Sequence, residues 1–172
     1  DNIKKVEELE DKYEAYQFYL DAVKRDGVAY DLITKALPTI EGEVNNILSQ
    51  LVDFQMLFEM DGKNINNYIV YDDDNVWPLE LSSGMERFIS SLAIRVALIN
   101  VSNLPRSNFL AIDEGWGTMD SDNLNSVYSL FQYLKTQFQF TLIVSHIDSM
   151  RDAVDTLLEV KKEHGYSNII FD

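Results

Sequence analysis

Apolar residues at the start of this chain recur with a helical period, and charged residues fill the positions between them. Within residues 1–26 the apolar side chains are spaced alternately four and three apart, at Leu9, Tyr13, Tyr16, Leu20 and Val23. This spacing is typical of a coiled-coil seam, although an ordinary amphipathic surface helix shows the same pattern over two heptads. Gly27 is expected to break the helix. Residues 1–26 are therefore predicted to be the end of a longer coiled coil.

The next part of the chain is predicted to hold a second helix and then a hairpin. The helix spans Val28 to about Val52, with Pro38 tolerated near its start or marking a kink. Between Phe54 and Trp77 the apolar period changes towards two, and the turn 61–64 contains a glycine, which indicates a β-hairpin. The cluster Asp72–Asp74 is interpreted as a solvated turn, although three carboxylates could also chelate a metal ion.

An apolar run leads directly into acidic residues in the second half of the chain. Phe109–Ile112 are apolar, and Asp113 and Glu114 follow them before a turn that contains glycines. The run predicts a strand buried on both faces, and ligands bind at the carboxyl edge of such strands in an open parallel sheet. Two adjacent carboxylates there can hold Mg²⁺ and orient a water molecule. An Asp-Glu pair after a strand can equally be a solvated turn.

A second apolar strand, Phe140–Val144, is predicted to deliver polar residues to a sheet edge. It ends at Ser145-His146, and the chain contains only one other histidine, His164, in a polar turn. His146 is positioned like a site residue, whereas His164 is expected at the surface. A histidine at a strand end can also be a hydrogen-bonded structural residue.

The remaining segments complete an α/β pattern. A helix is predicted over about residues 121–136, between the two apolar strands. Two short strand-like runs, Thr156–Val160 and Asn168–Phe171, are joined through His164-Gly165 and resemble a terminal hairpin.

A loop of small residues precedes another predicted helix. Ser82, Ser83 and Gly84 form the loop, and the helix from Glu86 onward carries apolar residues at helical spacing, Phe88, Leu92, Val96 and Ile99. Backbone N–H groups and the positive end of the dipole at a helix N-terminus can receive an anion such as phosphate. Alternatively, Ser82 or Ser83 is a plain N-cap, and Glu86 completes a capping box.

Composition limits the possible partners and compartments. The 172 residues are enough for about one domain, and 46% hydrophobic content is ample for a core. The net charge of −15 argues against a broad basic surface for nucleic acid, so any DNA contact must be local or shared with another chain. The absence of cysteine excludes disulfides and thiolate metal sites. No membrane-spanning run or signal peptide is apparent, so an intracellular protein, cytoplasmic or nuclear, is expected.

Taken in chain order, the serine-glycine loop that opens a helix, the apolar strand that ends at Asp113-Glu114, the GTMD that follows it and the apolar strand that ends at Ser145-His146 resemble the C-terminal lobe of an ABC-type ATPase head. More narrowly, SSGMERFISSLAIRVAL, FLAIDEGWGTMDS and TLIVSH resemble the SMC-like ATPases of double-strand-break repair, the SbcC type. The resemblance covers nearly the whole chain. It implies an α/β fold with a partly parallel sheet flanked by helices, a β-hairpin, a coiled-coil stub over residues 1–26 and a C-terminal ATPase lobe over residues 27–172.

The resemblance also implies a nucleotide-binding signature loop. In such heads the loop reads Leu-Ser-Gly-Gly followed by Glu or Gln, and either LSSG or SSGMER can be aligned to it. The second register keeps the following helix in phase, so we adopt it. Ser83, Gly84 and Glu86 then occupy signature positions. Met85 stands where a second glycine is usual, which is expected to narrow the room beside the phosphate.

The other site residues follow from the same resemblance. Asp113 resembles the Walker B aspartate that holds Mg²⁺ through water, and Glu114 resembles the catalytic carboxylate that activates the attacking water. Asp120 matches the D-loop aspartate, and His146 matches the switch histidine that senses the γ-phosphate. The implied cofactors are ATP and Mg²⁺.

The sequence lacks the phosphate-binding motif G-x-x-x-x-G-K-[ST], so this chain alone is expected to hydrolyse ATP negligibly. The resemblance implies four partners: an N-terminal P-loop lobe of the same protein, a second copy of the head in an ATP-dependent dimer, an SbcD-type nuclease at the base of the coiled coil, and DNA. The expected function is ATP-driven head dimerisation in double-strand-break repair or recombination. The alternatives are an SMC-type chromosome-organising head and a non-enzymatic coiled-coil interaction module.

Overall fold

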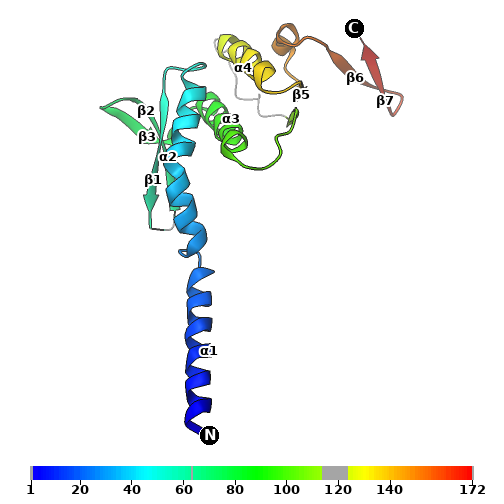
Figure 1. The fold of residues 1–172 in the computed structure, drawn as a ribbon. Coiled ribbons are helices and arrows are strands. Elements are labelled where there is room, and N and C mark those ends of the chain that lie inside the picture. Colours follow the sequence, from blue (N-terminus) through cyan, green and yellow to red (C-terminus); the bar gives the residue numbers. More distant parts are fainter. Residues whose placement is uncertain (1, 63, 114–123, 172) are drawn as a thin grey trace.

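The computed structural model describes residues 2–62, 64–113 and 124–171. Helices α1 (Asn2–Ala22) and α2 (Val28–Leu48) follow one another in a rod, with the N-terminus at its far end (Figure 1). Gly27 separates them, as predicted. A Cβ at this position would lie 2.3 Å from the Ala22 carbonyl oxygen, so only glycine fits the close approach of the two turns.

Helix α2 ends at Leu48, earlier than the predicted Val52. The reason is a long-range contact: the Asn45 side chain accepts a hydrogen bond from Met56 N at 2.8 Å and donates to Met56 O at 2.9 Å. Glu41 accepts a further bond from Phe58 N at 2.9 Å. These contacts turn the chain back along α2, so the helix cannot continue.

The predicted hairpin is confirmed and gains a third strand. Strands β1 (Gln55–Asp61), β2 (Asn64–Asp72) and β3 (Asn75–Pro78) form an antiparallel sheet in that order. The turn between β2 and β3 is exposed, and Asp72 Oδ1 accepts from Asp74 N at 3.0 Å and from Asn75 Nδ2 at 2.7 Å. Asp72–Asp74 is therefore the solvated turn that was expected.

The core lies where α2 and the sheet meet helix α3 (Gly84–Val101). A short 3₁₀ helix, η1 (Leu79–Leu81), leads from β3 to α3. The buried side chains of α2 and α3 recur at helical spacing along each helix. They include Val44, Ile47, Leu48, Ile89, Val96 and Ala97.

The second half contains a parallel strand pair, as predicted. Strand β4 (Phe109–Asp113) pairs with β5 (Phe140–Val144), and α4 (Leu124–Gln137) connects them. The 3₁₀ helix η3 (Asp148–Ala153) follows, and β6 (Leu158–Glu163) and β7 (Tyr166–Phe171) form the expected terminal hairpin. Its turn contains His164 (φ 52°) and Gly165 (φ 87°), and His164 is exposed, as expected.

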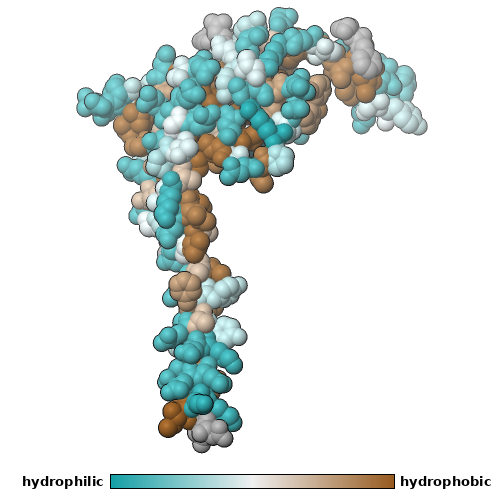
Figure 2. Space-filling model, viewed as in Figure 1, coloured by the Kyte–Doolittle hydropathy of each residue, from teal (hydrophilic) through white to brown (hydrophobic). Residues whose placement is uncertain are grey.

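Only one face of the β4–β5 pair is covered. Ile112 is buried, and Leu110 and Ile143 pack against the core, whereas the opposite face carries exposed Phe109, Phe140, Leu142 and Val144. The prediction that the first of these strands is buried on both faces is therefore wrong for the described chain, because its own helices supply one covering layer. Apolar surface accordingly appears in the part of the molecule that holds β4 and β5 (Figure 2). None of the helices in the described ranges is long and apolar enough for a transmembrane span.

Candidate functional site

The small-residue loop caps helix α3. Ser83 is the N-cap residue: its Oγ accepts from Glu86 N at 3.2 Å, and the Glu86 carboxylate accepts from Ser83 N at 2.6 Å. The neighbouring Ser82 is 8% exposed and donates through its Oγ to the Leu79 carbonyl at 2.7 Å. Of the two serines considered from the sequence, Ser83 therefore completes the capping box.

Capping leaves other donors of the loop for an anion. The N–H groups of Gly84 and Met85 lie in the first turn of α3, where a helix offers them no internal partner. The Ser83 side chain is exposed and its hydroxyl proton remains available, because the cap uses Oγ as an acceptor. The cap and the anion-receiving loop are thus compatible functions of one segment.

A pocket of about 530 Å³ adjoins this loop. Its walls come from the turn after α2, residues 49–54, from Tyr71 at the end of β2, from the first turns of α3 and from Ser126 of α4. Met85 is 7% exposed and contributes to both the core and the pocket wall. Met85, which the adopted register aligns with a second glycine, therefore bounds the space beside Ser83.

Tyr71 is the polar wall residue that sequence reasoning missed. Its hydroxyl donates to Glu86 Oε1 at 2.5 Å. Burial, together with the neighbouring Glu86 carboxylate, raises the pKa of Tyr71 to about 12. Partial burial raises the pKa of Glu86, but hydrogen bonds from Tyr71 and Ser83 outweigh this effect and hold that pKa below its ordinary value. Nothing in the sequence around Tyr71 signals this contact.

The second group of site residues lies at the carboxyl edge of β4 and β5. Asp113 is the register partner of Val144, and Ser145-His146 follows Val144 directly. The parallel register therefore brings Asp113 and His146 to the same sheet edge, where both are exposed. Glu114 and Asp120 lie outside the described residues.

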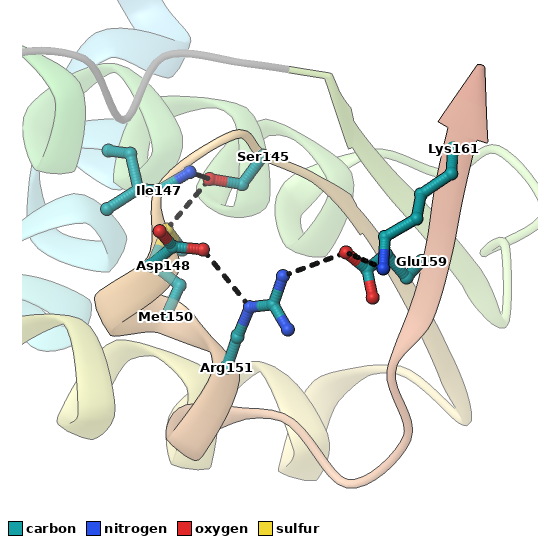
Figure 3. A network of polar contacts seen from close by, with 7 residues as sticks. All are labelled: Ser145, Ile147, Asp148, Met150, Arg151, Glu159 and Lys161. Carbon is teal, nitrogen blue, oxygen red and sulfur yellow. Dashed lines mark hydrogen bonds and ion pairs between the residues drawn. The ribbon is translucent and has the colours of Figure 1, made fainter. Parts of the chain in front are cut away.

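The turn after β5 is fixed by polar contacts, which Figure 3 shows. Ser145 Oγ accepts from Ile147 N at 3.1 Å and donates to Met150 Sδ at 3.2 Å, and Met150 is buried. Further along, Arg151 joins Asp148 at 3.2 Å and Glu159 at 3.4 Å, which ties η3 to β6. The backbone that follows the strand and carries His146 is thus anchored, while the histidine itself makes none of these contacts.

Asp113 is an exposed carboxylate at the strand edge, which suits a magnesium ion whose other ligands are water and phosphate oxygens. Among the described residues, no three metal-binding side chains form a cluster. Mg²⁺ in nucleotide sites keeps several water ligands and takes one or two carboxylates together with phosphate oxygens. Asp113 is the residue that would hold it.

Comparison with known proteins gives relatives in sequence and in fold, although no protein-family profile matches the chain. An uncharacterised protein of Acanthamoeba polyphaga mimivirus is 36% identical over 171 residues, which are 90% of this chain and 13% of that protein. The SbcC component of the SbcCD nuclease of Deinococcus radiodurans is 33% identical over 107 residues, 60% of this chain and 12% of that protein. The chain thus spans about an eighth of the length of these relatives.

Solved structures with a similar fold are SMC heads. One, from work on ATP-driven dimerisation of SMC ATPases, has a TM-score of 0.67 and 16% identity over 82% of this chain and 88% of that chain. The Pyrococcus furiosus SMC head bound to the C-terminal domain of ScpA has a TM-score of 0.65 and 18% identity, over 97% of this chain and 42% of that chain.

These similarities define the class: the chain has the fold of an SMC-type, ABC-like ATPase head, as an α/β lobe with a parallel strand pair and a projecting helix. Within that class its sequence is similar to SbcC, and it corresponds to the C-terminal lobe of such a head.

Proposed function

We propose that this chain supplies the signature loop and the Walker B edge of an ATP-hydrolysing head, and that ATP bound between two heads drives their pairing in an SbcC-like double-strand-break repair or recombination complex. The observation that carries the proposal is the register of β4 and β5, which brings Asp113 and His146 to one sheet edge. The roles of these two residues and of the Ser83 loop are taken from the resemblance of SSGMER, FLAIDEG and TLIVSH to SbcC-type motifs, and the overall similarity to SbcC supports that choice.

In this proposal each residue takes the role that the resemblance implies. Asp113 holds Mg²⁺, which neutralises phosphate charge when bound, and Glu114 orients and activates the attacking water. His146 senses the γ-phosphate, and Asp120 acts as the D-loop aspartate. Ser83, with the first N–H groups of α3, receives the γ-phosphate bound on the opposite head.

The site is composite because the sequence has no P-loop and therefore no lysine to bind the β- and γ-phosphates. An N-terminal P-loop lobe of the same protein supplies this part. The exposed apolar face of β4 and β5, with Phe109, Phe140 and Leu142, is the surface that such a lobe would cover. Residues 1–26 act as the end of the coiled coil, because the seam residues of α1 are exposed along its length.

An SbcD-type nuclease and DNA are the further partners in this proposal. The net charge of −15 requires that DNA contacts lie largely on other parts of the assembly. The SMC neighbour bound to part of ScpA favours a second candidate, an SMC-type chromosome-organising head. Co-purification of the complete protein with a nuclease would support the first candidate, and co-purification with a ScpA-type partner would support the second.

The decisive experiment replaces Glu114 by Gln in the complete protein. Turnover is expected to fall by about 10²–10⁴-fold, the usual contribution of a general base. ATP binding should remain, so ATP should hold the heads as a stable dimer, measured by light scattering. Glu163→Gln on exposed β6 is the control and should hydrolyse ATP like the unaltered protein. A Glu114→Gln protein that stays unpaired in ATP would contradict the proposal.

If the complete protein with intact Glu114 shows no turnover, the alternative of a non-enzymatic coiled-coil interaction module replaces it.

A further inference from the structure

A contact between the sheet and the signature loop has no counterpart in the motifs discussed so far. The Tyr71 hydroxyl donates to Glu86 Oε1, and Ser83 N donates to Glu86 Oε2. Both carboxylate oxygens of Glu86 are therefore engaged, one by β2 and one by the loop itself. A single hydroxyl on the sheet thus reaches the loop through one intermediate side chain.

An irregularity in strand β2 directs the Tyr71 side chain toward Glu86. The register of β2 and β3 shifts between Val70 and Asp72, because Val70 pairs with Val76 and Asp72 pairs with Asn75. Tyr71 is therefore the extra residue of a β-bulge, a feature that redirects a side chain. Its ring lies 5.6 Å from the ring of Phe54 and 5.5 Å from that of Trp77, measured between centroids.

The contact also affects the charge that an approaching phosphate meets. Glu86 Oε2 is bound to Ser83 N at the start of the loop, and a carboxylate that left this position for the N–H groups of Gly84 and Met85 would repel an anion there. Hydrogen bonds to charged acceptors are among the stronger ones and fix their geometry. Tyr71 and Ser83 N together hold the Glu86 carboxylate in the position that caps the helix. The N–H groups of Gly84 and Met85 and the Ser83 hydroxyl are left for the anion.

We propose that Tyr71 is a positioning residue for the signature loop, acting through Glu86 on the conformation of Ser83 and Gly84. The proposal rests on the proposed function, in which this loop receives a phosphate bound on the opposite head. Tyr71 touches no nucleotide in this scheme. Its hydroxyl stabilises the loop conformation that pairs with the opposite head. It does not affect the binding of ATP to the unpaired head.

The test compares Tyr71→Phe with the unaltered complete protein. Phenylalanine keeps the ring between Phe54 and Trp77 and removes only the hydroxyl. The matched control is Tyr68→Phe, three residues earlier on β2, whose hydroxyl makes no hydrogen bond with the described part of the chain. Three quantities are measured: hydrogen exchange of the Ser83 amide, the protein concentration for half-maximal pairing in ATP, and the affinity of unpaired heads for ATP.

Loss of a hydrogen bond to a carboxylate should accelerate exchange at Ser83 and raise the pairing concentration by about threefold to tenfold. The affinity of unpaired heads for ATP should stay unchanged, because Tyr71 touches no nucleotide in this scheme. A merely structural defect would alter this affinity as well. Tyr68→Phe should match the unaltered protein in all three measurements. This set of results would support the proposal.

Normal exchange at Ser83 in Tyr71→Phe, or faster exchange with unchanged pairing, would overturn the positioning role. Weaker ATP binding by the unpaired variant heads would also overturn it, because Tyr71 would then support the whole fold. If the unaltered protein fails to pair in ATP, the proposed function fails. The exchange measurement still decides, independently, whether Tyr71 holds the loop.

Discussion

The signature loop and the strand edge differ in how much of each this chain builds by itself. The loop is held by three elements: η1 through Ser82, α3 through the capping box, and β2 through Tyr71. At the strand edge, Asp113 and His146 are exposed, and the sheet beneath them is covered on one face only. The chain therefore forms the loop with its own contacts, whereas it leaves the strand edge exposed and one face of the sheet uncovered. A site that needs two heads is consistent with this division.

The largest expected effect tests the loop. Ser83→Arg in the complete protein should abolish ATP-dependent pairing, because the long side chain fills the approach to the N–H groups at the start of α3. Analytical ultracentrifugation with and without ATP measures the pairing. Thr39→Arg, at an exposed position of α2, is the control and should pair normally. Retained pairing of Ser83→Arg would show that the register placing Ser83 and Gly84 in the signature is wrong.

A matched pair of leucines tests the contrast in burial. Leu48 is 0% exposed in the core, and Leu142 is 39% exposed on the open face of β5. Leu48→Ala should lower the free energy of unfolding of this chain by about 2–5 kcal/mol, whereas Leu142→Ala should lower it by about 1 kcal/mol or less. Denaturant unfolding measures both changes.

The same pair is then measured in the complete protein. If a P-loop lobe covers the open face, Leu142→Ala should become more costly there, and Leu48→Ala should cost the same as before. An unchanged, small cost at Leu142 would mean that no other lobe packs against this face.

The smallest expected effect is the pH dependence of the loop. Glu86 has a folded pKa below its ordinary value, so its contribution to stability is present above pH 4.5 and is lost as the pH falls through the folded pKa. Tyr71 has a pKa raised to about 12, so its contribution is present below pH 10 and is lost as the pH rises through about 12. Denaturant unfolding at each pH measures these changes. Tyr71→Phe should reduce the alkaline loss, of which Tyr133, whose pKa burial also raises, keeps a part, and it should move the acid loss to higher pH. An unchanged acid limb would contradict the bond to Glu86.

The features predicted from the sequence are those with a local cause. The helices, the hairpin turns and the Ser83–Glu86 box follow from periodicity and from residues three or four positions apart. The strands Phe109–Asp113 and Phe140–Val144 were predicted from apolar runs of strand length, and their place in a partly parallel sheet was implied by the resemblance.

The features missed depend on contacts far apart in sequence. The early end of α2 depends on Asn45 bonding to Met56, and the third strand, Asn75–Pro78, has too few residues for a period to be visible. Tyr71 reaches Glu86, 15 residues later, only because a bulge redirects it. The one-sided sheet could not be predicted, because an apolar strand has the same sequence whether its second cover belongs to its own chain or to another.

The break at Gly27 gives the rod a point of mechanical compliance. No continuous ladder of helical hydrogen bonds joins α1 to α2; the chain crosses the gap with turns such as Gly27 N to Lys24 O at 2.9 Å. Arg25, within the gap, donates to Asn64 Oδ1 at 3.3 Å on the β1–β2 turn. Bending at this joint changes contacts of the short connection, such as the Arg25 bond, and no turn of either helix, so α1 can tilt while the helix that packs on α3 keeps its place.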